Sequence, residues 1–257
     1  VLLLFERGWI TQRLGADELT HYVVPMALAM QLQAFISSLV LVIFPLASEL
    51  KDENDKLLAL YLKATKAISF IVVFAVASAV VQSRVFLELW MGTEFAARSS
   101  TIMITQMACF GLISIMSIAW QMTEGLGHPR FNAFSIALST TIGVTLMIVF
   151  IGEYGAVGVA VARFTGFVVV SLSVFYVEKW FFGRIQTRFW LRLTGSLGFA
   201  AIVAVAIEYG ISTALPEKWP ALVLSVAAGG IAYCIVLWFL EFISADEKLL
   251  VKRLVGR

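Results

Sequence analysis

Charged residues are scarce in this chain of 257 residues: Asp, Glu, Lys and Arg make up 14% of it, whereas hydrophobic residues make up 60%. The mean hydropathy is +0.92. Soluble globular domains carry about 25% charged residues, so the composition excludes an ordinary soluble domain. The net charge is only +2, which implies no bulk attraction to nucleic acid.

Residues that build metal and redox sites are equally few. The two cysteines, Cys109 and Cys234, both fall in apolar stretches, where we expect small buried or lipid-facing residues rather than a disulfide or a metal site. His21 and His128 lie far apart without metal-ligand spacing. The sequence also lacks the nucleophile-elbow, phosphate-loop, zinc-protease and dinucleotide-binding motifs. We therefore expect a protein that is not an enzyme and uses no metal or cofactor.

Long apolar stretches dominate the sequence instead. A helix needs about 20 apolar residues to cross the hydrocarbon core of a bilayer. In lipid, only helices or closed barrels satisfy their own backbone, and barrel strands alternate apolar with polar residues, which these stretches do not. The sequence therefore predicts an all-α, polytopic transmembrane bundle of seven full spans. The seven stretches are 22–48, 67–83, 101–123, 131–152, 154–177, 193–215 and 219–240.

Positive charges between these stretches divide unequally. If each stretch crosses once, one side of the membrane carries five Lys or Arg residues and the other carries thirteen. Short loops rich in Lys and Arg stay in the cytoplasm, so we expect the first span to enter from outside and the C-terminus to be cytoplasmic. The five are Arg7, Arg13, Arg84, Arg98 and Lys218. The thirteen are Lys51, Lys56, Lys63, Lys66, Arg130, Lys179, Arg184, Arg188, Arg192, Lys248, Lys252, Arg253 and Arg257.

Turn residues predict how the spans are joined. The chain begins within apolar sequence, without Met or a basic segment, so we expect residues 1–15 to be the end of an earlier helix that stops at Gly15. Pro45 should kink the far end of the first full span or end its regular bonding. The tight turn at 153–155 predicts a hairpin of the fourth and fifth spans. Small residues on one face of the fifth span favour close helix packing: Gly155, Gly158, Ala162 and Gly166.

Arg163 is the one basic residue inside a span. A charge near a helix centre costs about 2.5–3.5 kcal/mol on insertion scales, so it requires a reason. Arg163 either faces a cavity that holds an anionic group, or it snorkels or pairs between helices. Gln31 and Gln106 lie at comparable depth, either in a polar ring that lines this cavity or in bonds between helices.

Two other charged positions complete the set of candidates. Arg7 should lie near the outer leaflet, where it either pairs with Glu6 or ends a helix. Glu208 lies toward the outer end of its span, and we expect it to reach water. With no Asp or Glu predicted in the middle of a span, an obvious proton or sodium relay is lacking. The candidate substrate-binding residues are Arg163, Arg7, Gln31 and Gln106.

Five segments of the chain, in their order and spacing, carry a family resemblance. Phe5-Glu6-Arg7 with Leu14-Gly15, then YVVPMALAMQLQAFISSLVLVIFPLASEL, LELWMGTEFAARSS, EGLGHPRFNA and GEYGAVGVAVAR follow one another along the sequence. Together they resemble the C-terminal part of a polysaccharide-type flippase of the multidrug/oligosaccharidyl-lipid/polysaccharide exporter superfamily. Members of that superfamily have a MATE-like fold of two helical bundles, fourteen helices in all.

The resemblance implies a domain organisation and a function. Residues 1–182 would hold the end of helix seven and helices eight to twelve, and residues 183–257 two additional helices and a cytoplasmic tail. Family members flip undecaprenyl-pyrophosphate-linked oligosaccharide repeat units across the bacterial inner membrane by alternating access, for O-antigen and other surface polysaccharides. The implied partners are the lipid-linked oligosaccharide, membrane lipids, the N-terminal half of the same protein and the polysaccharide polymerase machinery. Arg163 and Arg7 would suit the pyrophosphate.

Three other functions are also compatible with the sequence. A cation-coupled multidrug exporter of the same fold should carry acidic residues in its cavity. A membrane polysaccharide polymerase or ligase should carry a large outer loop with catalytic Arg or His, whereas the outer loops here are short. A scaffold without transport activity is the third, and Arg163 argues only weakly against it.

Overall fold

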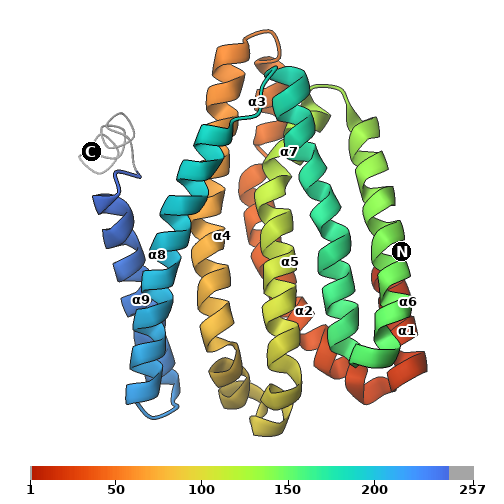
Figure 1. The fold of residues 1–257 in the computed structure, drawn as a ribbon, viewed down its shortest axis with the longest axis vertical. Helices are drawn as coiled ribbons and strands as arrows, with labels where there is room; N and C mark the ends of the chain where they lie inside the picture. Colours follow the sequence, from red (N-terminus) through yellow and green to blue (C-terminus); the bar gives the residue numbers. More distant parts are fainter. Residues whose placement is uncertain (1, 243–257) are drawn as a thin grey trace.

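The computed structural model describes residues 2–242, in which helices are joined by short turns (Figure 1). The all-α class predicted from the sequence is confirmed for this part of the chain. The helices are α1 (Leu2–Leu14), α2 (Ala16–Val40), α3 (Ile43–Glu49), α4 (Asn54–Met91), α5 (Thr93–Gly125), α6 (Pro129–Val168), η1 (Val169–Ser171), α7 (Leu172–Tyr176), η2 (Val177–Phe181), α8 (Thr187–Ala214) and α9 (Trp219–Phe239).

Six helical stretches within the described residues are long and apolar enough to cross a membrane. The fourth of them, Pro129–Phe181, is 53 residues long and reverses at Gly155, whose backbone (φ 56°, ψ −140°) is not helical. The predicted hairpin is therefore confirmed, and we call residues 129–154 its first arm and residues 156–181 its second arm. The others are Ala16–Glu49, Asn54–Met91, Thr93–Gly125, Thr187–Ala214 and Trp219–Phe239.

Small residues bring the two arms of the hairpin into backbone contact. A Cβ atom at Gly166 would lie 2.8 Å from the Ser139 carbonyl oxygen and 2.9 Å from the Gly143 Cα. Without a hydrophobic driving force in lipid, helices gain stability from this kind of close approach. The small residues predicted on the second arm thus serve helix packing.

Two breaks that were predicted from Gly and Pro also occur. Gly15 separates α1 from α2 with a φ of 94°, a left-handed conformation that glycine adopts readily. The helix that begins at Ala16 is interrupted between Val40 and Ile43. Pro45 lacks the N–H that would bond to the Leu41 carbonyl four residues earlier, which explains a break at this place.

Helix α5 is the centre of the bundle. More than half of its apolar stretch is buried, at least twice the share in any other candidate membrane helix of the described residues. It packs against α2, α3, α4 and α6, whereas α8 and α9 pack on each other and on α4 at one edge (Figure 1). The α1 helix packs against α2 and α6.

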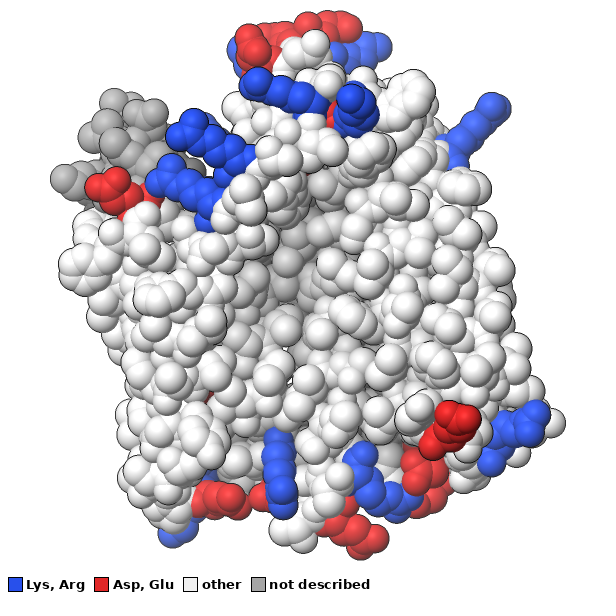
Figure 2. All heavy atoms as spheres, viewed as in Figure 1, with Lys and Arg blue, Asp and Glu red and all other residues white. Residues whose placement is uncertain are grey.

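On the face that Figure 2 shows, charged side chains gather at the two ends of the helices, with an uncharged belt between them. The turns after α3, after α5 and before α8 share one end, and the turns at Gly15, Gly92 and Gly155 share the other (Figure 1). The alternation assumed in the charge count is thus present in the fold. The predicted cytoplasmic tail, with Lys248, Lys252, Arg253 and Arg257, lies outside the described residues.

Candidate functional site

The guanidinium group of Arg163 lies inside the bundle, where it faces a carboxylate that sequence reasoning did not select. Arg163 is 3% exposed and Glu6 is fully buried. Arg163 Nε lies 3.2 Å from Glu6 Oε1. Glu6 comes from α1 and Arg163 from the second arm of the hairpin, so the Gly15 and Gly155 turns bring the two helices together.

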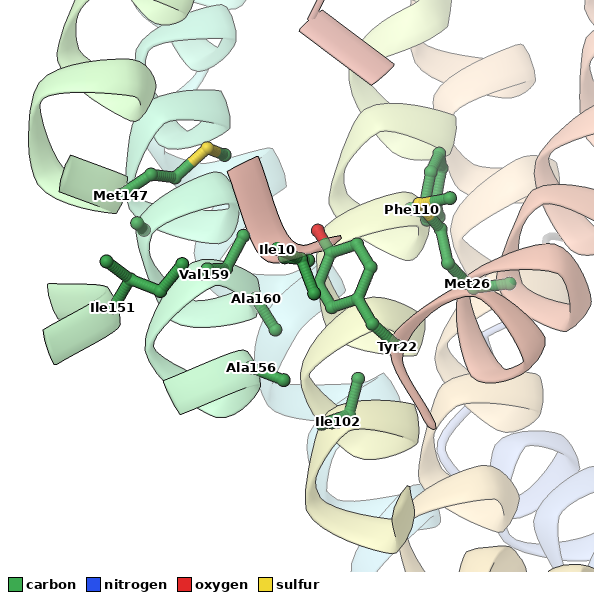
Figure 3. Close-up of a cluster of buried hydrophobic side chains, with 12 residues drawn as sticks. Ile10, Tyr22, Met26, Ile102, Phe110, Met147, Ile151, Ala156, Val159 and Ala160 are labelled. Carbon is green, nitrogen blue, oxygen red and sulfur yellow. The ribbon is translucent and has the colours of Figure 1, made fainter. Parts of the chain in front are cut away.

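The other groups around the Arg163 guanidinium are a thioether and two aromatic rings. Arg163 Nη1 donates a hydrogen bond to Met26 Sδ at 3.1 Å. Its Cζ atom lies 5.2 Å from the ring centre of Phe110 and 5.8 Å from that of Phe167. Cation–π attraction stabilises a guanidinium at these distances, more strongly where water is excluded. Figure 3 shows Met26 of α2 beside Phe110 of α5.

Polar groups that lie close to one another without hydrogen bonds of good geometry surround the ion pair. The Tyr22 hydroxyl lies next to the Glu6 carboxylate and the Gln106 amide. Within residues 2–242, the Tyr22 hydroxyl, both Gln106 amide atoms and both Glu6 oxygens are buried without a hydrogen bond of good geometry. Buried polar groups in native proteins are rarely left in this condition. These groups therefore form a polar centre that water or the polar atoms of a ligand can complete.

The ion pair makes this centre electrically neutral overall. Two unpaired charges in an apolar interior would each cost several kcal/mol in desolvation. Their mutual attraction offsets that cost, and removal of either partner leaves the other uncompensated. The pair therefore holds α1 strongly to the second arm. Another charged group that bound to Glu6 or Arg163 in place of its partner would release this restraint.

A groove of about 330 Å³ adjoins this centre. Phe110 and Phe167, the two rings beside Arg163, also line the groove, so they form a wall shared by both. The volume lies at the lower end of the range of about 300–1,000 Å³ for small-molecule sites. Its polar lining comes from α2 and α5: Gln33, Ser37, Ser117 and Gln121, with the indole of Trp120 beside them. Polar residues at membrane depth avoid lipid, which makes this a candidate passage for a polar ligand.

The predicted site residues separate into two groups. Gln106 lies with Arg163 in the polar centre, fully buried on α5. Arg7 and Gln31 are exposed and do not join it. Arg7 lies within α1 rather than at its end, and Glu6 pairs with Arg163 instead. A helix turns by 100° per residue, so adjacent residues such as Glu6 and Arg7 face different directions.

Sequence reasoning missed Glu6 and Tyr22 as members of the centre. Glu6 precedes the stretches that were counted as full spans. Tyr22 stands at the start of the first span, where an aromatic residue at the membrane interface is common. The available signal was the presence of one acidic and one basic residue in otherwise apolar helices, because buried charges in membrane proteins are paired.

The expectation that Glu208 reaches water is wrong. Glu208 is fully buried on α8 and accepts a hydrogen bond from Ser78 Oγ at 2.6 Å. Its side chain faces α4 and α9 rather than the end of the bundle, because the packing of α8 on these helices turns it inward.

Within residues 2–242, no group of three or more His, Cys, Asp or Glu side chains is placed to hold a metal ion.

A multi-pass helical bundle with a paired buried arginine is an arrangement typical of membrane transport proteins. Comparisons with known proteins give one family match and one match of fold. Residues 9–100 match the model of a family described as "Polysaccharide biosynthesis protein". No curated protein matches the chain in sequence.

A solved structure, described as "Lipid II flippase MurJ, inward closed conformation", has the same fold. The match has a TM-score of 0.74 at 14% sequence identity, and covers 87% of this chain and 47% of that one. The chain thus spans about half the length of that flippase. The resemblance drawn from the sequence is confirmed in two respects: the polysaccharide biosynthesis family over residues 9–100, and the MurJ-like fold over most of the chain.

Proposed function

We propose that this chain forms the C-terminal part of a transporter that flips undecaprenyl-pyrophosphate-linked oligosaccharide repeat units across the bacterial inner membrane. The observation that carries the proposal is the buried Arg163–Glu6 pair beside a polar groove at membrane depth. The polysaccharide biosynthesis match and the MurJ-like fold support the class of substrate. The protein would act by alternating access and would not be an enzyme.

Arg163 would recognise the pyrophosphate. A guanidinium presents a planar fork of donors that matches phosphate oxygens, and it stays charged under physiological conditions. To bind phosphate it must exchange Glu6 for the ligand. Tyr22 lies beside Glu6 and can then donate a hydrogen bond to its carboxylate, while Gln106 lies on the other side of the Tyr22 hydroxyl and can bond to it. Loss of the restraint between α1 and the second arm would couple substrate binding to a change in helix packing.

The groove would hold sugar rather than lipid. Its four polar side chains offer hydrogen bonds to hydroxyl groups, and Trp120, Phe110 and Phe167 offer flat apolar faces to sugar rings. The exposed Arg7 and Gln31 stay in the proposal as contacts for the substrate or for the N-terminal half of the same protein. Membrane lipids would cover the rest of the uncharged belt, and the polymerase machinery would receive the exported unit.

We further propose seven crossings with the C-terminus in the cytoplasm. The six candidate helices supply seven crossings because one of them is the hairpin that turns at Gly155. The end that carries the turns after α3 and α5 and before α8 would be cytoplasmic, since it holds most of the positive residues.

The neutral Arg163–Glu6 pair also bears on the alternatives. A cation-coupled multidrug exporter should carry unpaired acidic residues in its cavity, whereas Glu6, the acidic residue of this centre, is already balanced by Arg163. A polymerase requires a substantial outer segment, and the outer turns within the described residues are short, as at Gly15, Gly92 and Gly155.

Deletion of the gene tests the function. We expect loss of surface polysaccharide together with accumulation of lipid-linked repeat units on the cytoplasmic leaflet, both reversed by the wild-type gene. Normal surface polymer without accumulation would contradict the proposal. Increased sensitivity to drugs with normal polymer would favour the exporter, and accumulation of exported but unpolymerised units would favour the polymerase.

A further inference from the structure

Glu208 is a second buried carboxylate, and it has no counter-charge. It lies where α8 meets α4 and α9, apart from the Arg163 centre. Among residues 2–242, no basic side chain forms an ion pair with it. An isolated carboxylate in an apolar interior is costly, so the surroundings must either keep it neutral or supply a cation.

Polar side chains from three helices converge on the Gln82 amide, which lies beside this carboxylate. Ser78 Oγ on α4 lies 2.6 Å from Glu208 Oε1. The Gln82 amide nitrogen, also on α4, lies 3.5 Å from Glu208 Oε2. The same nitrogen lies 3.0 Å from Ser212 Oγ on α8 and 3.0 Å from Ser225 Oγ on α9. The amide of Gln82 therefore sits among oxygens of a carboxylate and two hydroxyls.

The cluster has the composition of a site for a hard cation. It offers two carboxylate oxygens, three serine hydroxyls and, on the Gln82 side chain, an amide oxygen that lies 3.2 Å from Ser212 Oγ. Hard cations prefer such oxygen ligands, and they accept carboxylates, amide oxygens and hydroxyls alike. Rotation of the amide exchanges its nitrogen for this oxygen and changes the centre from a donor to an acceptor.

Charge balance selects a monovalent ion. A single carboxylate with neutral ligands becomes neutral with one positive charge, whereas a divalent ion would leave a net charge in an apolar interior. The close approach of α9 favours a small ion, because a Cβ atom added at Gly229 would lie 2.5 Å from Glu208 Oε1.

We propose that Glu208, Ser78, Gln82, Ser212 and Ser225 form a site for a small monovalent cation, of which sodium is the natural probe. The bound ion joins α4, α8 and α9, so it stabilises the attachment of the two C-terminal helices to the bundle. This site is independent of the substrate assigned to the Arg163 centre.

Thermal unfolding of the purified protein in sodium chloride, potassium chloride and choline chloride at equal concentration tests the site. We expect Tm to rise by about 2–4 °C in sodium relative to choline once sodium exceeds its Kd about tenfold. Glu208→Gln should abolish the rise, since it removes the charge but keeps the shape. The matched control is Glu153→Gln at the exposed outer turn, which should keep the full rise.

Saturable binding of radioactive sodium to the wild-type protein is the second measurement. It tests the site even if the Glu208→Gln variant does not fold. Ser225→Ala should raise the sodium concentration needed for half-saturation. Equal Tm values in the three salts with no saturable sodium binding would overturn the proposal. So would sodium binding that neither Glu208→Gln nor Ser225→Ala weakens, because the ion would then lie elsewhere.

Discussion

Two carboxylates lie buried in the apolar interior of this chain, and each is accommodated in the opposite way. Glu6 has a full counter-charge in Arg163 at 3.2 Å, but its oxygens have no hydrogen bond of good geometry within the described residues. Glu208 has a short hydrogen bond from Ser78 and the Gln82 amide nearby, but no basic partner in residues 2–242. One site is balanced in charge and poor in hydrogen bonds, and the other is the reverse.

The difference indicates what each site can bind. A paired charge with unsatisfied polar neighbours can exchange its partner for a charged ligand, because the ligand replaces one ion and brings hydrogen-bond acceptors. A single negative charge with hydrogen-bonding neighbours has no partner to exchange, and it becomes neutral when it gains a cation. Glu6 and Arg163 therefore suit an anionic substrate, and Glu208 suits a cation. The following predictions separate the two cases by their effects on stability.

The largest effect should come from Arg163→Met, which keeps an unbranched side chain but leaves Glu6 unpaired. We expect a loss of about 3–5 kcal/mol in the free energy of unfolding. The double variant Glu6→Gln/Arg163→Met should recover most of this loss, since no net charge is then buried. Denaturant unfolding of the purified variants measures both values. A double variant as unstable as the single one would show that packing, not charge, dominates at this site.

A smaller effect should come from Ser78→Ala in sodium-free buffer. This change removes the donor at 2.6 Å from Glu208 Oε1 and leaves a buried acceptor short of a partner. We expect a loss of about 1–3 kcal/mol in the free energy of unfolding. Ser38→Ala is the matched control, because Ser38 is exposed and bonds only to the Phe35 carbonyl of its own helix. If Ser78→Ala and Ser38→Ala lowered the free energy of unfolding equally, hydrogen-bond donors would not be what stabilises buried Glu208.

The smallest effect should come from Arg98→Ala at the outer end of α5. Arg98 pairs there with Asp17, at 2.9 Å, and with Glu18, in a solvent-accessible position. Water and salt screen exposed pairs, so we expect no measurable change in Tm. A loss comparable with that of Arg163→Met would mean that burial does not distinguish the two ion pairs.

The sequence predicts the architecture well because bilayer crossing constrains it strongly. Apolar length gave the helices, the glycine at 155 gave the hairpin, and Pro45 gave the break after Val40. Arg163 was found because a lone charge in an apolar helix is conspicuous. Its partner Glu6 was not found, since the pairing of two charges depends on which helices lie in contact. The burial of Glu208 was missed for the same reason: its depth along α8 is visible in the sequence, but the face it turns to α4 and α9 is not.

The export activity of the Glu6→Gln/Arg163→Met double variant tests the central claim most directly. This variant should fold, so a loss of function would come from loss of the buried charges themselves. In a strain deleted for the gene, we expect it to reach normal abundance yet leave lipid-linked repeat units on the cytoplasmic leaflet. Arg130→Met, at an exposed position of the same helix α6, should restore export fully. Full export by the double variant would contradict a role of Arg163 in substrate recognition.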